Sequence, residues 1–225
     1  MRAADTQEIT IRVDDAHVVS GLLDVPLRAR ACYVLAHGAG AGMTHPFMAA
    51  VAAGLGERGV ATLRYQFPYM EQGSKRPDAP KLAHATVRAA VAEAVRHVPK
   101  LPLVAGGKSF GGRMTSQAQA IAPLAGVRGL AFLGFPLHPA KKPSDERAQH
   151  LFDVRIPMVF LQGTRDALAD LALLEALVER LGARATLTLF AGADHSFHVA
   201  GRGAPSDAEV RDTMLDALAA WIDHT

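Results

Sequence analysis

The sequence has little of several features that would assign it to a particular class of protein. A single cysteine, Cys32, excludes an intramolecular disulfide and any zinc module built on several cysteines. The 24 basic and 22 acidic side chains leave a net charge of only +2 over 225 residues, too little to attract nucleic acid or an anionic membrane from a distance. We therefore expect neither as a partner, and the low cysteine content favours a reducing, cytoplasmic location.

Long apolar runs are also missing. Residues 1–8 are polar where a secretory signal would need an apolar stretch, and no uncharged apolar run is long enough to cross a bilayer. Aromatic residues make up only 6% of the chain, but 49% of it is hydrophobic, which is enough to build a sizeable core. The length fits one globular domain, which we expect to span residues 1–225.

Short β-rich runs alternate with longer helical patterns, which predicts an α/β fold with a mostly parallel sheet. We expect strands at 8–13, 18–25, 32–36, 60–65, 101–105, 127–133, 158–162 and 185–190, and helices at 47–58, 82–97, 110–121, 171–181 and 207–222. The first two strands alternate apolar and polar residues and should form an antiparallel pair at the sheet edge. The irregular segments 66–80 and 136–145 follow strands, so we expect them to wall a ligand site, with plain surface connections as the alternative.

The sharpest local signal is the run Gly-Gly-Lys-Ser-Phe-Gly-Gly at 106–112, between a predicted strand and a predicted helix. A phosphate-binding loop ending in Gly-Lys-Ser would need a glycine where Pro102 stands, so that interpretation fails. The spacing Gly107-x-Ser109-x-Gly111 instead matches the tight turn that presents a nucleophilic serine between a strand and a helix. A glycine-rich turn with an incidental serine is the alternative.

A serine nucleophile needs a base and a carboxylate that orients the base. In folds with this turn, the acid and then the histidine follow on loops after later strands. Asp166 comes directly after the strand predicted at 158–162, and His195 after the strand predicted at 185–190, so we expect these three residues to be catalytic. Other candidates for base or acid remain among the later residues: His138, His198, Asp170 and Asp194.

Acyl transfer also needs two backbone N–H groups that stabilise the oxyanion. The first is expected to be the amide of Phe110, the residue after the nucleophile. The second should come from the glycine-rich loop at 37–42, and we favour Ala39, with Gly40 as the next candidate. This chemistry requires no metal and no cofactor.

The substrate pocket is expected to be lined by residues on loops that follow strands. These residues are His37, Gly40, Phe67, Tyr69, Met70 and Phe135. Packing in the core is the alternative for each aromatic side chain. Basic residues also surround the predicted mouth in sequence, namely Arg64, Lys75, Arg76, Lys108, Arg113 and Arg165. If they converge, they favour an anionic acyl substrate; otherwise they are separate solvated charges or salt-bridge partners.

These motifs together carry a family resemblance. The chain resembles the α/β hydrolases along almost its whole length. The resemblance is carried by the turn at Ser109, by His37-Gly38, by Gly-Thr-Arg-Asp166 and by Ala-Asp-His195. More narrowly, the chain resembles the small serine hydrolases related to testis-expressed protein 30, in segments 37–42, 67–69, 107–113 and 134–139. That group is in turn similar to the dienelactone hydrolases. The resemblance implies about eight mostly parallel strands with helices on both faces, no lid domain, and serine hydrolase chemistry on carboxylic-ester-like substrates.

We therefore expect a serine hydrolase of the carboxylesterase type that cleaves a carboxylic ester or thioester of a small molecule. Dienelactone hydrolases proper are expected to carry a cysteine nucleophile, and Ser109 departs from that pattern. A small peptidase or a lyase on the same triad remains an alternative. So does a catalytically silent interaction module, because the same group is similar to a subunit of a chromatin-modifying complex. An open site without a lid argues against a triacylglycerol lipase.

Overall fold

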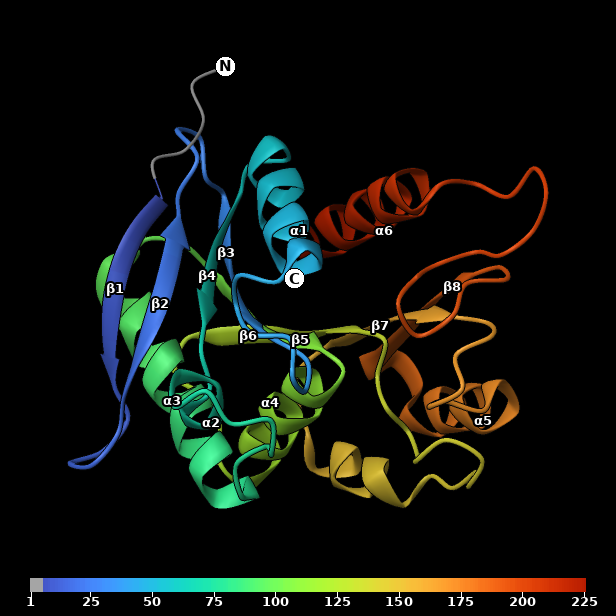
Figure 1. Cartoon of the computed structure of the whole chain (residues 1–225), viewed down its shortest axis with the longest axis horizontal. Helices are drawn as coiled ribbons and strands as arrows, with labels where there is room; N and C mark the ends of the chain where they lie inside the picture. Colours follow the sequence, from blue (N-terminus) through green and yellow to red (C-terminus); the bar gives the residue numbers. More distant parts are fainter. Residues whose placement is uncertain (1–5) are drawn as a thin grey trace.

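The computed structural model describes residues 6–225, so the first five residues of the polar N-terminal stretch lie outside the described part. Eight strands form one sheet in the order β1-β2-β4-β3-β5-β6-β7-β8 (Figure 1). They are β1 (Thr6–Arg12), β2 (Val18–Asp24), β3 (Ala31–Ala36), β4 (Val60–Tyr65), β5 (Leu103–Lys108), β6 (Val127–Leu133), β7 (Met158–Gly163) and β8 (Ala185–Phe190). β2 is antiparallel to β1 and β4, and the other neighbours are parallel.

Helices cover both faces of this sheet (Figure 1). One face carries α1 (Pro46–Glu57) and α6 (Asp207–Ile222), and the other carries α3 (Pro80–His97), α4 (Phe110–Ile121) and α5 (Leu171–Leu181). The chain also forms a single-turn helix, α2 (Pro68–Glu71), and two 3-10 helices, Glu146–Asp153 and Gly182–Arg184. The expected eight-stranded, mostly parallel α/β sheet with helices on both faces is thus confirmed, and within residues 6–225 no lid domain interrupts it.

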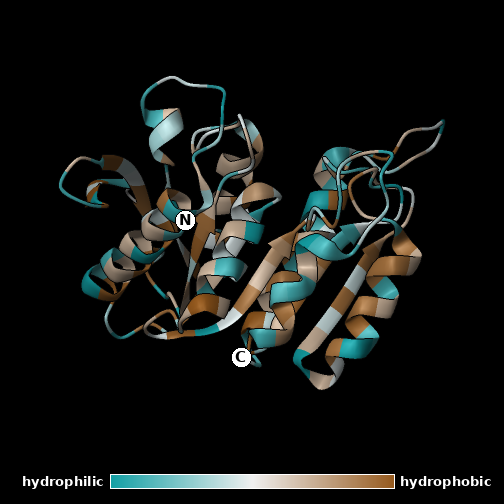
Figure 2. Ribbon diagram, turned by 90° about the horizontal axis from the view of Figure 1, so that it is seen from below, coloured by the Kyte–Doolittle hydropathy of each residue, from teal (hydrophilic) through white to brown (hydrophobic). Residues whose placement is uncertain are grey.

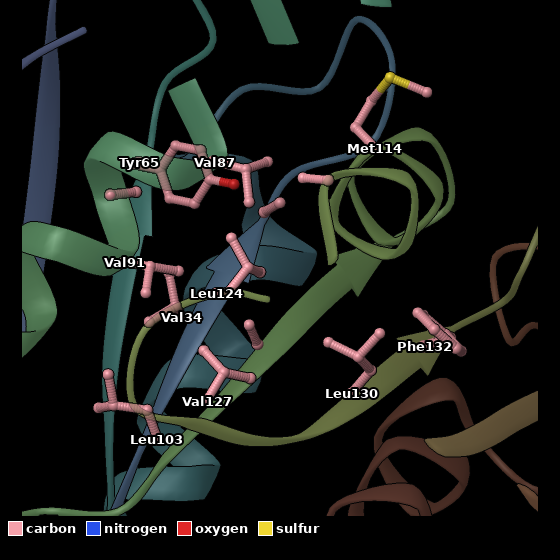
Figure 3. Close-up of a cluster of buried hydrophobic side chains, with 14 of the residues drawn as sticks. Val34, Tyr65, Val87, Val91, Leu103, Met114, Leu124, Val127, Leu130 and Phe132 are labelled. Atoms are coloured by element: carbon pink, nitrogen blue, oxygen red, sulfur yellow. The ribbon is translucent and has the colours of Figure 1, made fainter. Parts of the chain in front are cut away.

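The core consists of two apolar layers, one on each side of the sheet. In the layer under α3 and α4, Val87, Val91 and Met114 pack towards strand residues such as Val34 and Leu103 (Figure 3). Figure 2 shows the same division in colour, because the helices are apolar on one side and polar on the other. Each such side chain contributes about 1.5–3 kcal/mol when fully buried. Among residues 6–225, no helix combines the length and apolarity needed to cross a membrane.

The largest correction to the predicted elements concerns β5. The strand begins at Leu103 instead of 101, because Pro102 has no N–H to give to a ladder, and it continues to Lys108. Gly106 and Gly107 therefore lie inside the strand, at φ 148° and 142°. A Cβ on Gly106 would stand 1.9 Å from the carbonyl oxygen of Ala131, so only glycine lets the strand approach its neighbour here.

Of the two segments predicted as irregular, 66–80 contains a short helix, whereas 136–145 has no helix or strand, as expected. The first, 66–80, contains α2, and the second leads directly into the 3-10 helix at Glu146–Asp153. Helices this short carry too few residues for an apolar periodicity to be visible. Both segments contact other loops: the Tyr69 hydroxyl accepts from Gly40 N at 3.0 Å, and His138 N donates to Leu168 O at 2.9 Å. Neither segment lines the cleft described next, so the expectation that they wall the site is wrong; they support the loops that surround it instead.

Candidate active site

Ser109 occupies a strained turn between β5 and α4. Its backbone has φ 49° and ψ −114°, a conformation that a residue with a side chain rarely adopts, and its amide donates to Leu133 O at 3.2 Å. The turn is tight because Gly111 lies against β3, where a Cβ would be 2.5 Å from His37 O. This geometry places the Ser109 hydroxyl at the carboxyl end of the sheet, at the start of a helix.

Three side chains from separate loops meet at this point. His195 Nε2 lies 2.9 Å from Ser109 Oγ, and His195 Nδ1 lies 2.7 Å from Asp166 Oδ2. Because a carboxylate only accepts hydrogen bonds, Nδ1 is the protonated nitrogen and Nε2 faces the hydroxyl as an acceptor. The Asp166 side chain is fully buried, whereas the His195 side chain keeps 25% of its surface exposed. The arrangement can therefore take a proton from the hydroxyl and still be reached by a ligand.

Asp166 is held by further donors. Gln162 Nε2 donates to Asp166 Oδ2 at 2.6 Å, and Leu168 N donates to the other carboxylate oxygen at 2.8 Å. The side-chain oxygen of Gln162, Oε1, in turn accepts from Phe135 N at 2.8 Å, which fixes the orientation of the side-chain amide. Gln162 was not singled out from the sequence, although one polar residue in the apolar strand β7 was a usable signal.

The segment that carries His195 is closed on itself. Asp194 accepts from the amides of Ser196 and His198, and Ala193 pairs with Val199 in an isolated bridge. Phe197 adopts a positive φ of 65° within this compact turn, and its ring is buried. The imidazole is thus presented from a fixed backbone.

The other candidates for base and acid have different partners. His138 is buried, with Nδ1 on Pro139 O and Nε2 accepting from Asp170 N at 2.7 Å. Asp170 caps α5 by accepting from Leu173 N at 3.1 Å. His198 Nδ1 lies 2.7 Å from exposed Asp207, outside the Ser109 cluster. Of the candidates, only His195 contacts Ser109 by a hydrogen bond within residues 6–225, and Asp166 is the carboxylate that contacts His195.

A cleft of about 350 Å³ opens onto Ser109 and His195. Its other walls include Gly38, Ala39, Phe47, Met48, Lys108 and Leu168. Phe47 and Met48 belong to the first turn of α1, and Leu168 follows Asp166. The sequence did not indicate these apolar walls, because their positions at the cleft depend on how α1 and the β7–α5 loop pack.

Two backbone amides at or next to this cleft have no protein acceptor among the described residues. Within residues 6–225, the Ala39 and Phe110 N–H groups engage no protein acceptor. The Gly40 N–H, the alternative from the sequence, donates to the Tyr69 hydroxyl at 3.0 Å. Gly38 brings the loop close to the serine, since a Cβ there would be 3.8 Å from Ser109 Cβ.

None of the six predicted pocket residues lines the cleft, and five of them are wholly or partly buried, whereas Gly40 is exposed. His37 is fully buried: Nδ1 donates to Gly38 O at 2.8 Å and Nε2 accepts from Phe67 N at 3.1 Å. Burial lowers the pKa of His37 to about 4, so it is a neutral group that ties the β3 loop to the β4 loop.

The predicted aromatic walls have packing roles. Phe67 is buried edge-on to Phe110 at 5.3 Å, and Phe135 packs with the rings of two strand phenylalanines. Tyr69 is 2% exposed, and its hydroxyl engages Gly40. Met70 packs at the rear of the loop, where a Cβ on Gly42 would be 3.3 Å from its methyl group.

The basic residues do not converge on the cleft. Arg64 is buried and pairs with Asp24 at 3.0 Å, Arg113 lies on α4, and Lys75, Arg76 and Arg165 are exposed. Lys108 is the one that lines the cleft. No group of three or more His, Cys, Asp or Glu side chains in the described chain is arranged to hold a metal ion.

Comparisons with known proteins agree with this fold. The family model described as alpha/beta hydrolase domain matches residues 29–223. A dienelactone hydrolase from Anabaena variabilis superposes with a TM-score of 0.78 at 21% identity, covering 99% of both chains. An α/β serine hydrolase without a lid from Xanthomonas campestris has a TM-score of 0.75 at 18% identity, over 98% of this chain and 97% of that one.

An α/β serine hydrolase homologue from Coxiella burnetii is similar to the same extent. Its TM-score is 0.76 at 17% identity, over 97% of this chain and 99% of the other. At these identities the structural likeness shows the shared fold, while the family model covers most of the sequence. The chain therefore belongs to the alpha/beta hydrolase domain family.

Proposed function

We propose that this protein is a serine hydrolase that cleaves a carboxylic ester or thioester of a small molecule by acyl transfer, with Ser109, His195 and Asp166 as its catalytic triad. The observation that carries the proposal is the chain of two hydrogen bonds, 2.9 Å and 2.7 Å, that joins the strained Ser109 to the buried Asp166 through His195. Membership of the hydrolase family supports a hydrolytic activity. The ester or thioester substrate is inferred from the chemistry of this group of residues.

In the first step Ser109 Oγ forms a bond to the carbonyl carbon while its proton passes to His195 Nε2. The carbonyl π electrons move to the oxygen, which becomes the oxyanion. When the oxyanion collapses, the bond to the leaving group breaks, and His195 gives its proton to the departing alcohol or thiol. Asp166 orients the ring and stabilises the imidazolium throughout.

In the second step a water molecule replaces the leaving group. His195 takes one proton from the water, the resulting hydroxide attacks the acyl carbon, and collapse of the second oxyanion breaks the bond to Ser109 Oγ. The proton returns from His195 to Ser109, so the enzyme is restored and the products are a carboxylic acid and the alcohol or thiol.

We propose that the amides of Phe110 and Ala39 form the oxyanion hole. Phe110 follows Ser109 in the chain, Ala39 lines the same cleft as Ser109, and within residues 6–225 both amides lack a protein acceptor, which supports this role. The start of α4 adds a favourable dipole, since no acidic residue lies in its first turn. Each donor is worth about 3 kcal/mol of transition-state stabilisation in such sites.

The size of the cleft favours a small substrate. About 350 Å³ is at the lower end of the range for small-molecule sites, and Ala39, Phe47, Met48 and Leu168 offer apolar contact to a short acyl chain. A lidless cleft of this kind also leaves little cover for a long lipid chain.

Labelling with a fluorophosphonate probe tests the proposal, because the probe reacts with an activated serine and the adduct can be mapped by mass spectrometry. We expect one adduct, on Ser109, lost in Ser109→Ala and strongly slowed in His195→Ala. Ser116→Ala is the matched control, since Ser116 also lies beside a histidine, and it should label at the wild-type rate. Short-chain nitrophenyl esters and thioesters then rank the substrates.

The absence of an adduct on well-folded protein would contradict the proposal and favour a silent interaction module. Labelling of Ser109 without turnover of esters or thioesters, but with cleavage of peptides, would support the peptidase alternative. We also propose a cytoplasmic location, on the ground of the low cysteine content; cell fractionation tests this independently of the activity.

A further inference from the structure

Lys108 connects the serine turn to the histidine segment. It is the last residue of β5 and the immediate neighbour of Ser109, and its Nζ donates a hydrogen bond to the backbone carbonyl oxygen of His195. Its stem passes Gly38, where a Cβ would be 3.4 Å from Lys108 Cγ. The side chain therefore spans from the residue that carries the hydroxyl to the residue that carries the imidazole.

Two aromatic rings and a glycine surround the ammonium group of Lys108. Nζ lies 5.8 Å from the ring centre of Phe47 and 5.1 Å from that of Phe197, and the two rings are nearly parallel, 6.1 Å apart. Gly134 leaves the remaining space: at φ +70°, a Cβ there would be 2.8 Å from Nζ. Two aromatic faces and a carbonyl dipole all favour a cation at this position.

Keeping a charge here has a cost. Burial lowers the pKa of Lys108 to about 8, although attraction to Asp166 and Asp194 opposes the shift. An apolar side chain of similar length would fill the same space without that desolvation. The balance indicates that the ammonium group serves the site and not merely the packing.

We infer that Lys108 is a positioning residue, which holds the backbone of His195 at a fixed distance from Ser109 during the reaction. This inference rests on the proposed hydrolase function. In each turnover the bond between His195 Nε2 and Ser109 Oγ must break, because the imidazole carries the proton on to the leaving group. The bond from Lys108 to the His195 carbonyl is not consumed by the chemistry, so it keeps the base in place while that bond is broken.

The test compares Lys108→Met with the wild type, using Lys142→Met as the control. Methionine keeps the length of the stem and its contact with the rings but removes the ammonium group, and Lys142 is exposed away from the cleft. With a neutral nitrophenyl ester, we expect Lys108→Met to lower kcat about 10- to 100-fold with little change in KM. The rate of fluorophosphonate labelling should fall by the same factor, and Lys142→Met should change neither.

Chemical rescue separates the ammonium group from a structural effect. In Lys108→Cys, alkylation with 2-bromoethylamine rebuilds a side chain of lysine's length and charge, whereas iodoacetamide adds a neutral group. We expect the amine to restore most of the lost kcat and the amide not to. Cys32 is buried and its thiol pKa is raised to about 12, so it should not compete for the reagent.

The outcomes distinguish this inference from the proposed function. A wild-type protein that neither labels nor hydrolyses contradicts the function itself. A reactive wild type with an equally active Lys108→Met overturns the positioning role alone. A loss confined to esters that bear a carboxylate, with neutral esters unaffected, also overturns it and makes Lys108 a substrate-binding residue. If both alkylating agents restored kcat, the Lys108 side chain would be needed only for packing, and the positioning role of its ammonium group would be overturned.

Discussion

Two serine–histidine pairs have their serines at or within α4 and look alike at first sight. Ser109 immediately precedes α4, and its Oγ is 2.9 Å from His195 Nε2; Ser116 lies about two turns further along, and its Oγ is 2.8 Å from His150 Nε2. Their separations differ by less than the variation among ordinary hydrogen bonds. The distance between hydroxyl and imidazole therefore does not by itself separate Ser109, the proposed nucleophile, from Ser116.

Their surroundings do distinguish them. Ser116 is fully buried in regular helix, and its hydroxyl donates to Arg113 O at 2.9 Å. Burial, together with the positive charge of Arg113, lowers the pKa of His150 to about 4. An imidazole in that position resists taking up a proton, whereas His195 has a buried carboxylate on its second nitrogen. The proposed activation of Ser109 thus depends on Asp166, the third member of the group, and on access from the cleft.

The largest effect should come from removing the serine of each pair. If the difference in surroundings is decisive, Ser109→Ala should lower kcat for a reactive ester about a millionfold, to the limit of detection. Ser116→Ala should keep kcat within about twofold, since Ser116 has no access to the cleft. Steady-state kinetics on purified variants measures both; equal losses would show that the two pairs are coupled.

The next effect concerns the carboxylate. Asp166→Asn should lower kcat about 10⁴-fold, because an amide no longer fixes the histidine tautomer whose Nε2 accepts from the serine. Asp153→Asn is the matched control: exposed Asp153 acts on His150 only through its charge. Its kcat should be unchanged. Thermal unfolding of both variants would show whether any loss reflects misfolding instead.

The third effect is on stability and depends on pH. The folded protein holds the pKa of His150 near 4, below its ordinary value of 6.5. The unfolded chain therefore binds more protons between these values, and the free energy of unfolding falls as the pH drops from about 6.5 towards 4. At about 1.4 kcal/mol per pKa unit, His150 accounts for a loss of about 3 kcal/mol over this window.

His150→Gln removes that contribution while leaving a side-chain amide that can still hydrogen-bond to the Ser116 hydroxyl. Urea unfolding at pH 7 and pH 4 should show a loss of stability smaller by about 3 kcal/mol in this variant than in the wild type. His37, whose pKa is also lowered to about 4, remains in both proteins, so a smaller pH dependence persists. If variant and wild type lost the same free energy of unfolding between pH 7 and pH 4, the titrating group would be a residue other than His150.

The smallest effect is on the stability of the structural pair at neutral pH. Ser116→Ala removes the hydroxyl that contacts His150 Nε2 and Arg113 O, so both of these hydrogen bonds are lost. We expect the free energy of unfolding at pH 7 to fall by about 1–2 kcal/mol. Urea denaturation detects this difference; a stabilised variant would mean that the pair is strained.

Much of the fold was predictable from the sequence because it depends on local patterns. The alternation of short apolar runs with periodic helices gave eight strands, and β4, β6 and β8 match their predicted bounds. The turn at Ser109 was visible for a similar reason: glycine is required at Gly107 of β5 and at Gly111 of α4, because both lie against the backbone at the end of β3. Asp166 and His195 could be ranked because both follow strands in the expected order.

The walls of the cleft could not be ranked in this way. Phe67 and Phe135 occupy loops after strands, as pocket residues do, yet both are buried behind the site. Phe47 and Leu168 have no distinguishing local pattern, and they line the cleft because of where α1 and the β7–α5 loop pack. Which side of a loop faces a ligand depends on contacts between segments that are distant in sequence.

The sequence alone thus determined the order of strands and helices, the strained serine turn and the residues able to act as its acid and base, since each depends on local composition and spacing. Only the tertiary structure decided which histidine meets Ser109, that Gln162 holds Asp166, and that Lys108 bonds the carbonyl of His195. Those contacts join residues that are adjacent only after eight strands align their carboxyl ends in one sheet.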